Sequence, residues 1–504
     1  MNDWDMRHHT PAPTKNSASR LPRLLSLVSI ATSLALTTPV SAGEATPKAP
    51  LPISPKEAKV SAGLLNDYLR MQSPAFSEWD IGGQFRFRYE LKDDAGSFPN
   101  RDFISRGLDN DNDYFLFREK IHVGWQPEGW LKFYVEGRGA QVASDERDPS
   151  PDDDVFDLHQ AYIQLGGTKD FPLRLKVGRQ EMLYGDERFI GIGDWSNTGR
   201  SFDAVNLRWS LGESTWIDVF ASNVVIARDD YFNESNDEDI FSGIYASSQE
   251  LISTLETQAF FLARNVDSGS PNAIAPGIGG PSERDVYTYG VRLKSLPGAF
   301  GNWDFAFEGA GQFGDVVSSG RELDLQTYAL TGNAGYTFVN TWGKPRIGVG
   351  YDYGSGDGDP NDSKQETFEQ LFGTNHRFYG LMDLVGLRNT NSPRVSLSIK
   401  PTKKLTVSMD YLLYWLADTN DSFYPESGSG RNANGYGKNP QFDSFVGSEL
   451  DLVMKYAVTP WADFQLGYGH FFPGDYIKSS VGRVPANGGA TGADWFYVQT
   501  TINF

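Results

Sequence analysis

The sequence contains no cysteine among its 504 residues. This absence excludes a disulfide framework, a thiolate metal site and a thiol nucleophile. Beyond residue 42 there is also no run of about 18 consecutive apolar residues, so we expect no helix that spans a membrane. Basic residues are in deficit, with 45 Lys and Arg against 65 Asp and Glu, which argues against nucleic acid as a partner.

Residues 1–42 have the features of a secretory signal peptide. Arg20 and Arg23 precede an apolar run over 24–36, and the small-residue stop Val40-Ser41-Ala42 follows it. We therefore expect an exported chain that is cleaved after this stop.

The segment 43–79 comes next and is predicted to be periplasmic. Ser54-Pro55 is a plausible helix start, and apolar residues follow it at helical spacing, namely Val60, Leu64, Tyr68 and Leu69. The pattern indicates one short helix, which would lie in the periplasm or enter a pore.

From residue 80 to 504 the sequence alternates apolar and polar residues. Over 81–91 aromatic and aliphatic side chains fall on one face, while Gln84, Arg86, Arg88 and Glu90 fall on the other. The chain has 53 Gly and is 13% aromatic, and no helical period interrupts the alternation. This combination is typical of a membrane barrel, whose strands show one face to lipid and the other to the lumen.

The same alternation predicts 18 strands joined by short turns at one end and long loops at the other. They lie near 81–91, 115–125, 131–138, 156–166, 172–182, 201–210, 215–224, 239–247, 254–264, 285–295, 302–313, 323–337, 345–354, 393–400, 404–415, 447–457, 461–471 and 494–504. We therefore predict an all-β fold: an 18-stranded antiparallel transmembrane β-barrel with short periplasmic turns and long extracellular loops.

The last predicted strand ends at the aromatic residue Phe504. It must pair with the first strand, because an open edge in lipid leaves unpaired backbone groups. A terminal aromatic of this kind resembles the signal that the outer-membrane insertion machinery reads. A soluble β-sandwich or propeller is the alternative.

The alternation assigns the polar face of each strand to the lumen. On the first six strands the predicted pore-lining residues are Arg86, Arg88, Arg118, Lys120, Lys132, Arg138, Arg174, Lys176 and Arg208, with the acids Glu90 and Glu136. On later strands they are Arg292, Lys294, Arg346, Lys400 and Lys455, with Asp304, Glu308, Asp352, Asp410, Glu449, Asp451 and Asp463. We expect a basic wall opposite a mixed to acidic wall, unless these charges pair with one another.

Arg179 falls in the outward phase of its strand. A lipid-facing arginine costs about 2–4 kcal/mol near the bilayer midplane. We therefore expect a bulge at Gly178 to turn Arg179 into the lumen or toward a loop.

Several loop regions have functional and structural interpretations. Asp357, Asp359 and Asp362 lie in Gly-rich sequence and could hold Ca²⁺, although EF-hand spacing is not met and a simple turn is the alternative. No other cofactor is expected. The segment 354–392 is too long and too apolar for a bare loop, so we expect it to fold inward, cap the mouth or pack on neighbouring loops.

The acidic stretches 145–154 and 229–239 indicate solvated surface, or cation bridges to outer-membrane lipid.

Four stretches resemble the alginate export family of outer-membrane barrels. They are the run Gly-Arg-Gln-Glu-Met-Leu-Tyr-Gly-Asp-Glu-Arg at 178–188, the run Gly-Ser-Gly-Asp-Gly-Asp-Pro at 354–360, the run Thr-Asn-His-Arg-Phe-Tyr-Gly-Leu-Met-Asp at 374–383 and the run Phe-Pro-Gly-Asp-Tyr at 472–476. The resemblance implies an 18-stranded monomeric pore. It also implies outward passage of an acidic polysaccharide past arginines, although the 354–360 and 374–383 stretches resemble the broad family rather than the dedicated exporter.

The function predicted from these features is a passive outer-membrane channel for an anionic polysaccharide or for small anionic or sugar solutes. One rival is an enzyme such as a barrel lipase, for which His376 with Ser363 and Asp383 is the available set. No nucleophile elbow surrounds this histidine, so no catalytic residue is expected. The other rival is an adhesion or scaffold barrel with a plugged pore.

Overall fold

The computed structural model describes residues 63–504 apart from 109, 268–269, 271–282 and 319. The predicted signal peptide and the part of the N-terminal segment up to residue 62 lie outside the described residues. Among the residues described, no helix is long and apolar enough to cross a membrane.

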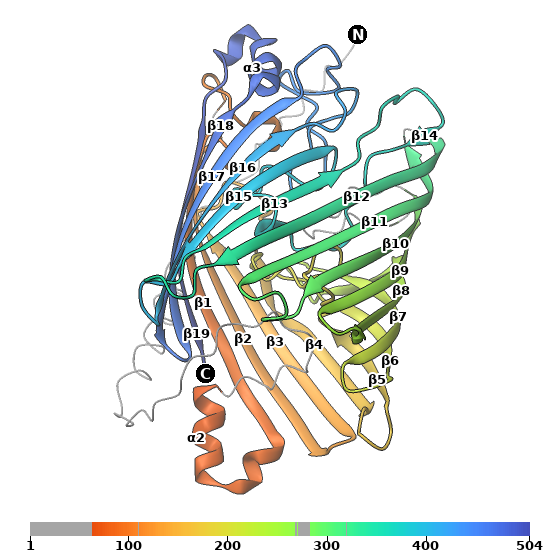
Figure 1. The fold of residues 1–504 in the computed structure, drawn as a ribbon. Helices are drawn as coiled ribbons and strands as arrows, with labels where there is room; N and C mark the ends of the chain where they lie inside the picture. Colours follow the sequence, from red (N-terminus) through yellow and green to blue (C-terminus); the bar gives the residue numbers. More distant parts are fainter. Residues whose placement is uncertain (1–62, 109, 268–269, 271–282, 319) are drawn as a thin grey trace, which may run out of the picture. The chain divides into compact units, whose positions relative to one another are not determined.

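Eighteen long antiparallel strands form a closed ring, as the sequence predicts (Figure 1). The ring consists of β1 (Trp79–Asp93), β2 (Asn112–Glu128), β3 (Leu131–Ala143), β4 (Asp154–Gly166), β5 (Leu173–Gln180), β6 (Phe202–Ser210), β7 (Thr215–Ile226), β8 (Glu234–Ile252), β9 (Leu255–Val266), β10 (Arg284–Ser295), β11 (Trp303–Ser318), β12 (Arg321–Thr337), β13 (Arg346–Gly354), β15 (Thr390–Ile399), β16 (Leu405–Trp415), β17 (Phe445–Thr459), β18 (Ala462–Pro473) and β19 (Ala493–Asn503). The two-residue β14 (Lys364–Gln365) pairs in parallel with β12, while β13 pairs directly with β15.

Strand alternation sorts the side chains between the two faces of the ring. On β1, Phe85 and Phe87 are exposed on the outer face, whereas Arg86, Arg88 and Glu90 are buried on the inner face. An apolar outer face and a polar inner face are what a bilayer and an aqueous lumen select.

The two ends of the barrel differ in the length of their connections. Short turns join β2 to β3, β6 to β7, β8 to β9 and β17 to β18 at one end. Long loops at the other end include 94–111, 181–201, 355–389, 416–444 and 474–492. These loops contain the short helices η3 (Pro99–Arg101), η4 (Asn375–Arg377), α3 (Asp475–Gly482) and η5 (Pro485–Asn487). This asymmetry makes the long-loop end extracellular and the short-turn end periplasmic.

The seam of the barrel lies between β1 and β19. Their pairing begins at Gln84 and Asn503, and Gly83 and Phe504 exchange backbone hydrogen bonds of 3.0 and 2.9 Å beyond it. The helix α2 (Leu64–Gln72) and η2 (Pro74–Glu78) precede β1. Asn66 of α2 accepts from the Ile81 N–H of β1 at 2.8 Å, so α2 satisfies part of the strand edge that β19 leaves open.

Two loops fold against the inner face of the wall. We name them the β5–β6 loop (181–201) and the β13–β15 loop (355–389). They join each other through a parallel bridge between Ile190 and Phe372. One buried cluster combines residues of both loops with inner-face residues of the wall from β6 to β12, including Phe220 and Tyr245. The predicted inward folding of the long 354–392 segment and its packing on another loop therefore occur together.

A second buried cluster lies against β16–β19. It joins Met382 and Leu384 of the β13–β15 loop to inner-face residues such as Tyr414 and Trp495 and to Tyr476 of α3. The inward loops therefore pack on two separate parts of the wall.

Candidate functional site

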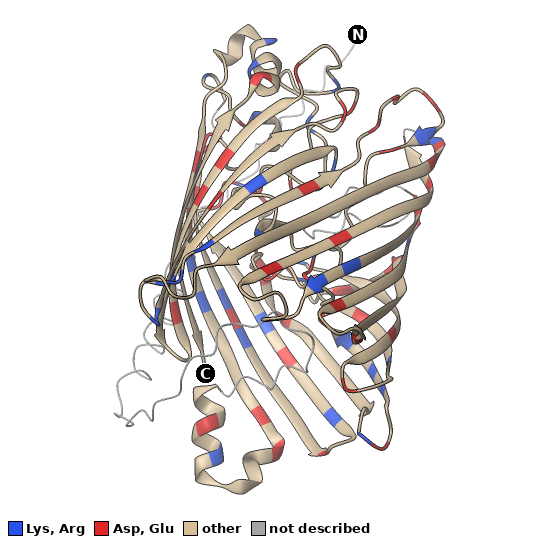
Figure 2. Cartoon of the chain, in the orientation of Figure 1, with Lys and Arg blue, Asp and Glu red and all other residues tan. Residues whose placement is uncertain are grey.

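The basic inner wall is built by neighbouring strands. Arg86 and Arg88 of β1 and Arg118 of β2 all face inward and are buried, with exposed fractions of 4, 1 and 3%. Arg86 and Arg118 occupy directly paired positions of the two strands. Figure 2 shows basic and acidic residues distributed along these strands.

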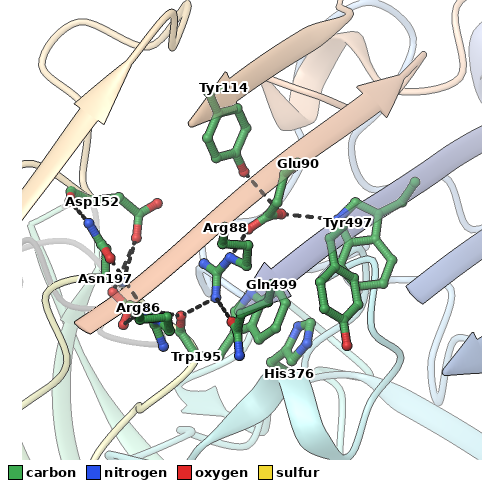
Figure 3. Close-up of polar contacts among 12 residues, drawn as sticks. Arg86, Arg88, Glu90, Tyr114, Asp152, Trp195, Asn197, His376, Tyr497 and Gln499 are labelled. Carbon is green, nitrogen blue, oxygen red and sulfur yellow. Dashed lines mark hydrogen bonds and ion pairs between the residues drawn. The ribbon is translucent and has the colours of Figure 1, made fainter. Parts of the chain in front are cut away.

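These three arginines bind the main chain of the β5–β6 loop, and Figure 3 shows this for Arg86 and Arg88. Arg86 donates to the carbonyl oxygens of Trp195 and Ser196 at 3.1 and 3.0 Å, Arg88 to that of Trp195 at 2.8 Å, and Arg118 to that of Asp194 at 3.0 Å. A guanidinium carries donors and no acceptor, so loop carbonyls are suitable partners. The arginines predicted to line the pore therefore hold a loop.

Trp195 connects the wall to the β13–β15 loop. The guanidinium carbon of Arg88 lies 3.7 Å from the centroid of the Trp195 ring. The ring of His376 stacks on Trp195 at 3.8 Å with an interplanar angle of 7°, and His376 Nδ1 lies 3.0 Å from the carboxylate of Asp383. Arg88, Trp195 and His376 thus form a stack from the wall to the second loop (Figure 3).

A nearby part of the wall, on β17 three strands from β1 around the ring, holds the β13–β15 loop by the complementary chemistry. Glu449 and Asp451 of β17 are buried and accept hydrogen bonds from the backbone N–H groups of Met382 at 3.0 Å and Leu381 at 3.2 Å. Carboxylates accept and do not donate when ionised, so they bind N–H groups where the arginines bind carbonyls. Basic and acidic walls therefore each anchor a loop through its backbone.

Several of the other predicted charges on the inner face form ion pairs. The pairs are Lys120 with Glu181 (3.2 Å) and Glu136 (3.7 Å), Arg138 with Asp154 (2.6 Å), Arg208 with Asp218 (2.5 Å), Arg292 with Asp186 (2.8 Å) and Glu256 (3.1 Å), Arg346 with Asp304 (2.6 Å), and Asp352 with Arg188 (2.9 Å). Glu308 is buried opposite Arg292 on the paired strand. Mutual pairing, the alternative to a freely exposed basic wall, applies to this group.

Two ion pairs of Asp186 attach the β5–β6 loop to β10. Asp186 lies 2.8 Å from Arg292 and 2.5 Å from Lys294. Burial acts to raise the pKa of Asp186, but the charges of Arg292 and Lys294 outweigh it and lower the pKa to about 2. The neighbouring Glu187 has a raised pKa because burial dominates there.

The wall near the periplasmic end remains half-exposed. Lys132 of β3, Arg174 and Lys176 of β5, and the tyrosines Tyr134 and Tyr162 all belong to the inward phase and are only partly buried. This surface lies nearer the short turns than Arg86 and Arg118, beyond the positions that the β5–β6 loop covers.

For Arg179 the structure contradicts the predicted bulge and the inward direction, but it agrees with the predicted contact to a loop. The pairing of β5 with β4 and β6 runs through Gly178 without a register shift, so no bulge turns Arg179 inward. Arg179 keeps the outward phase and forms a bidentate ion pair with Asp203 of β6 at 2.8 and 2.9 Å. It also donates a hydrogen bond to the carbonyl oxygen of Asn233. The arginine is neutralised at the upper rim of the wall, where the loop after β7 reaches it.

The predicted calcium ligands do not come together. Asp357, Asp359 and Asp362 each accept a hydrogen bond from the backbone N–H two residues further on, at 3.2, 3.1 and 2.7 Å. Among the described residues, the groups of carboxylates and histidines close enough to share an ion are elsewhere. The alternative of a turn built by Asp side chains describes this segment.

The four histidines of the barrel each lie beside a carboxylate. The pairs are His122 with Asp80 (3.0 Å), His159 with Glu181 (2.9 Å), His376 with Asp383 (3.0 Å) and His470 with Asp494 (2.8 Å). His376 is the histidine that was considered for an enzyme, and its ring stacks on Trp195. Its role in the structure is to join two loops.

The loop residues that contact the wall were not among those predicted from the sequence. Asp194, Trp195 and Asn197 belong to a long loop. The length of this loop could have indicated a folded segment, as the length of 354–392 did. Asn197 donates to the carbonyl of Phe117 on β2 at 3.0 Å, so this loop also contacts the strand backbone.

Comparisons with known proteins agree with this architecture. A comparison with curated protein sequences gives no match. Among solved structures, the chain is similar to OccK9 (OpdG) of Pseudomonas aeruginosa, with a TM-score of 0.55, 11% identity, and coverage of 85% of this chain and 98% of that chain. It is also similar to OccD3 (OpdP) of the same organism, with a TM-score of 0.53, 12% identity, and coverage of 85% of this chain and 91% of that chain. The outer membrane protein OpdK of the same organism matches with a TM-score of 0.51, 11% identity, and coverage of 84% of this chain and 99% of that chain. At these identities the likeness shows the fold.

The family assignment rests on a separate match. A family profile described as Alginate export matches residues 77–490, which covers nearly the whole barrel. The stretches singled out in the sequence lie within this range. The chain therefore belongs to the Alginate export family and is an outer-membrane β-barrel protein.

Proposed function

We propose that this protein is a passive outer-membrane channel for small anionic solutes. The observation that carries the proposal is the half-exposed periplasmic wall, where Lys132 and Lys176 contact tyrosine rings at 5.5 and 3.9 Å. Low-dielectric walls strengthen the field of such cations and raise the local concentration of anions.

The inward loops favour small solutes over a polymer. The β5–β6 and β13–β15 loops are each bound to the wall and to each other. A polysaccharide chain would have to displace buried, charge-assisted hydrogen bonds, each of which contributes about 1.5–3 kcal/mol. An anionic polysaccharide such as alginate is the second candidate, because the family description names alginate export.

Reversal potentials in planar bilayers test the anion preference. Under a KCl gradient the purified protein should favour chloride, and the double variant Lys132→Glu/Lys176→Glu should lower the chloride-to-potassium permeability ratio severalfold because two cations become anions. Lys478→Glu on the extracellular helix α3 is the matched control and should leave the ratio near its original value. A pore with no anion preference, or one whose preference ignores the double variant, would contradict the proposal.

Uronic-acid oligomers of increasing length separate the two solute classes. A small-solute channel should admit the monomer and be blocked, or left unaffected, by longer chains. Passage of long oligomers into receiving liposomes would instead favour the polysaccharide candidate.

A further inference from the structure

A row of rings crosses the half-exposed periplasmic wall. His122 of β2 stacks on Tyr134 of β3 with centroids 5.6 Å apart, and Tyr134 stacks on Tyr162 of β4 at 5.2 Å, both at an interplanar angle of 21°. Tyr134 and Tyr162 occupy directly paired positions of their strands. We name these three rings the aromatic row.

A lysine ends the aromatic row on the β5 side. Position 178, which is paired with Tyr162, is a glycine with φ +123°, and a side chain there would collide with the carbonyl of Ala161. The face of Tyr162 turned toward β5 is therefore open, and the ammonium of Lys176 lies over it at 3.9 Å. Lys132 lies 5.5 Å from the ring of Tyr134.

The orientation of the rings decides which part of each ring a solute meets. Because the rings stack on one another from strand to strand, their faces are turned toward the neighbouring strands. These faces are covered by the adjacent rings and by Lys176, so the edges of the rings are turned toward the lumen. An aromatic ring is negative on its face and positive at its edge. The row thus presents positive edges next to ammonium groups.

Like charges also crowd this surface. Arg174 and Lys132 repel the ammonium of Lys176, while the carboxylate of Glu181 attracts it and offsets part of this repulsion. An anion that binds here relieves this repulsion. Sugar rings, in contrast, pack their C–H groups on aromatic faces, and these faces are already occupied.

We infer that the aromatic row with Lys132 and Lys176 is a binding subsite for aromatic carboxylates. The carboxylate contacts the two ammonium groups, and the electron-rich face of the solute ring meets the edges of Tyr134 and Tyr162 in an edge-to-face arrangement. The inference rests on the proposed anion channel and adds a solute class and a location near the periplasmic end.

Block of the chloride current by added carboxylates tests the subsite. Benzoate and cyclohexanecarboxylate carry the same charge and nearly the same size, but benzoate alone has a π face. In the unaltered protein benzoate should half-block the current at a concentration about two- to twelvefold lower, the factor expected from one edge-to-face contact. The effect should be stronger when the blocker is added from the short-turn side.

Variants of Tyr162 assign the effect to the aromatic row. Tyr162→Leu should bring the two half-blocking concentrations together, whereas Tyr162→Phe keeps the ring and should restore the difference. Tyr289→Leu, which changes an exposed tyrosine on the outer face of β10, is the matched control. Heat-modifiable migration on gels shows that each variant has folded.

The outcomes separate the two proposals. Equal block by both carboxylates in an anion-preferring pore would overturn the aromatic subsite and leave the channel intact. Loss of the difference in Tyr289→Leu would also overturn it. A pore without anion preference would remove the proposed function itself.

Discussion

At the scale of single residues, Arg86 and Arg118 join the barrel wall to loop carbonyls rather than to a solute. A hydrogen bond from a charged donor contributes about 1.5–3 kcal/mol, and several of them meet at residues 194–196. The main role of the charges on this wall is therefore to fix the position of the loop, and their effect on solutes is secondary.

Removing these donors should free the loop. We expect the double variant Arg86→Leu/Arg118→Leu to show a larger and noisier single-channel conductance, because the loop carbonyls lose their partners and the loop leaves the wall. Arg346→Leu is the control, since Arg346 pairs with Asp304 and does not contact this loop. Conductance equal to that of the unaltered protein would show that the loop stays in place without the arginines.

At the scale of elements, the β5–β6 loop is also held from β10 through Asp186. The folded-state pKa of this carboxyl is about 2, below its ordinary value of 3.8. Its ionised form thus contributes about 2 kcal/mol to holding the loop. The contribution is complete above pH 3.8 and is lost as the pH falls through 2.

A pH series measures this attachment. Between pH 5 and 2 the conductance of the unaltered protein should rise as Asp186 takes up its proton. Asp186→Asn should already show the raised conductance at pH 6, because the amide carries no charge for Arg292 and Lys294. Asp170→Asn in the exposed turn before β5 should follow the unaltered protein, and a similar shift there would point to other carboxyls.

The strands and the inward folding of the 354–392 segment could be predicted from the sequence, but the contacts that the loops make could not. Alternation along 81–91 places Arg86 and Arg88 inside because a two-residue period is a local property of the chain. The contact of Trp195 with His376 joins residues far apart in sequence, and no local pattern encodes it. Arg179 was misplaced for a related reason: its partner Asp203 sits on the neighbouring strand, and that pair makes an outward arginine acceptable.

At the scale of the whole molecule, closure of the ring depends on space around the C-terminal residue. A Cβ added at Gly83 would lie 2.3 Å from the carbonyl of Lys120 and 2.5 Å from the ring of Phe504. Gly83 and Phe504 also exchange the backbone hydrogen bonds that continue the seam. An open edge in lipid is costly, so the seam governs whether the barrel persists.

Gly83→Val should therefore reduce the yield of closed barrel. We expect a smaller fraction of heat-modifiable protein after refolding into detergent, and a lower temperature at which the folded band disappears. Gly129→Val in the β2–β3 turn is the control, because a Cβ there meets nothing within 4 Å. Equal folded fractions for the two variants would mean that the seam tolerates the added bulk.

The anchoring of both inward loops has an evolutionary consequence. Wall arginines bind carbonyl oxygens, and wall carboxylates bind N–H groups, at positions where every residue other than proline offers both. Substitutions at the loop tips can then change the shape and charge of the passage without detaching the loops. Such a scaffold can acquire new solute preferences by drift in a few side chains while the barrel and its charged walls stay the same.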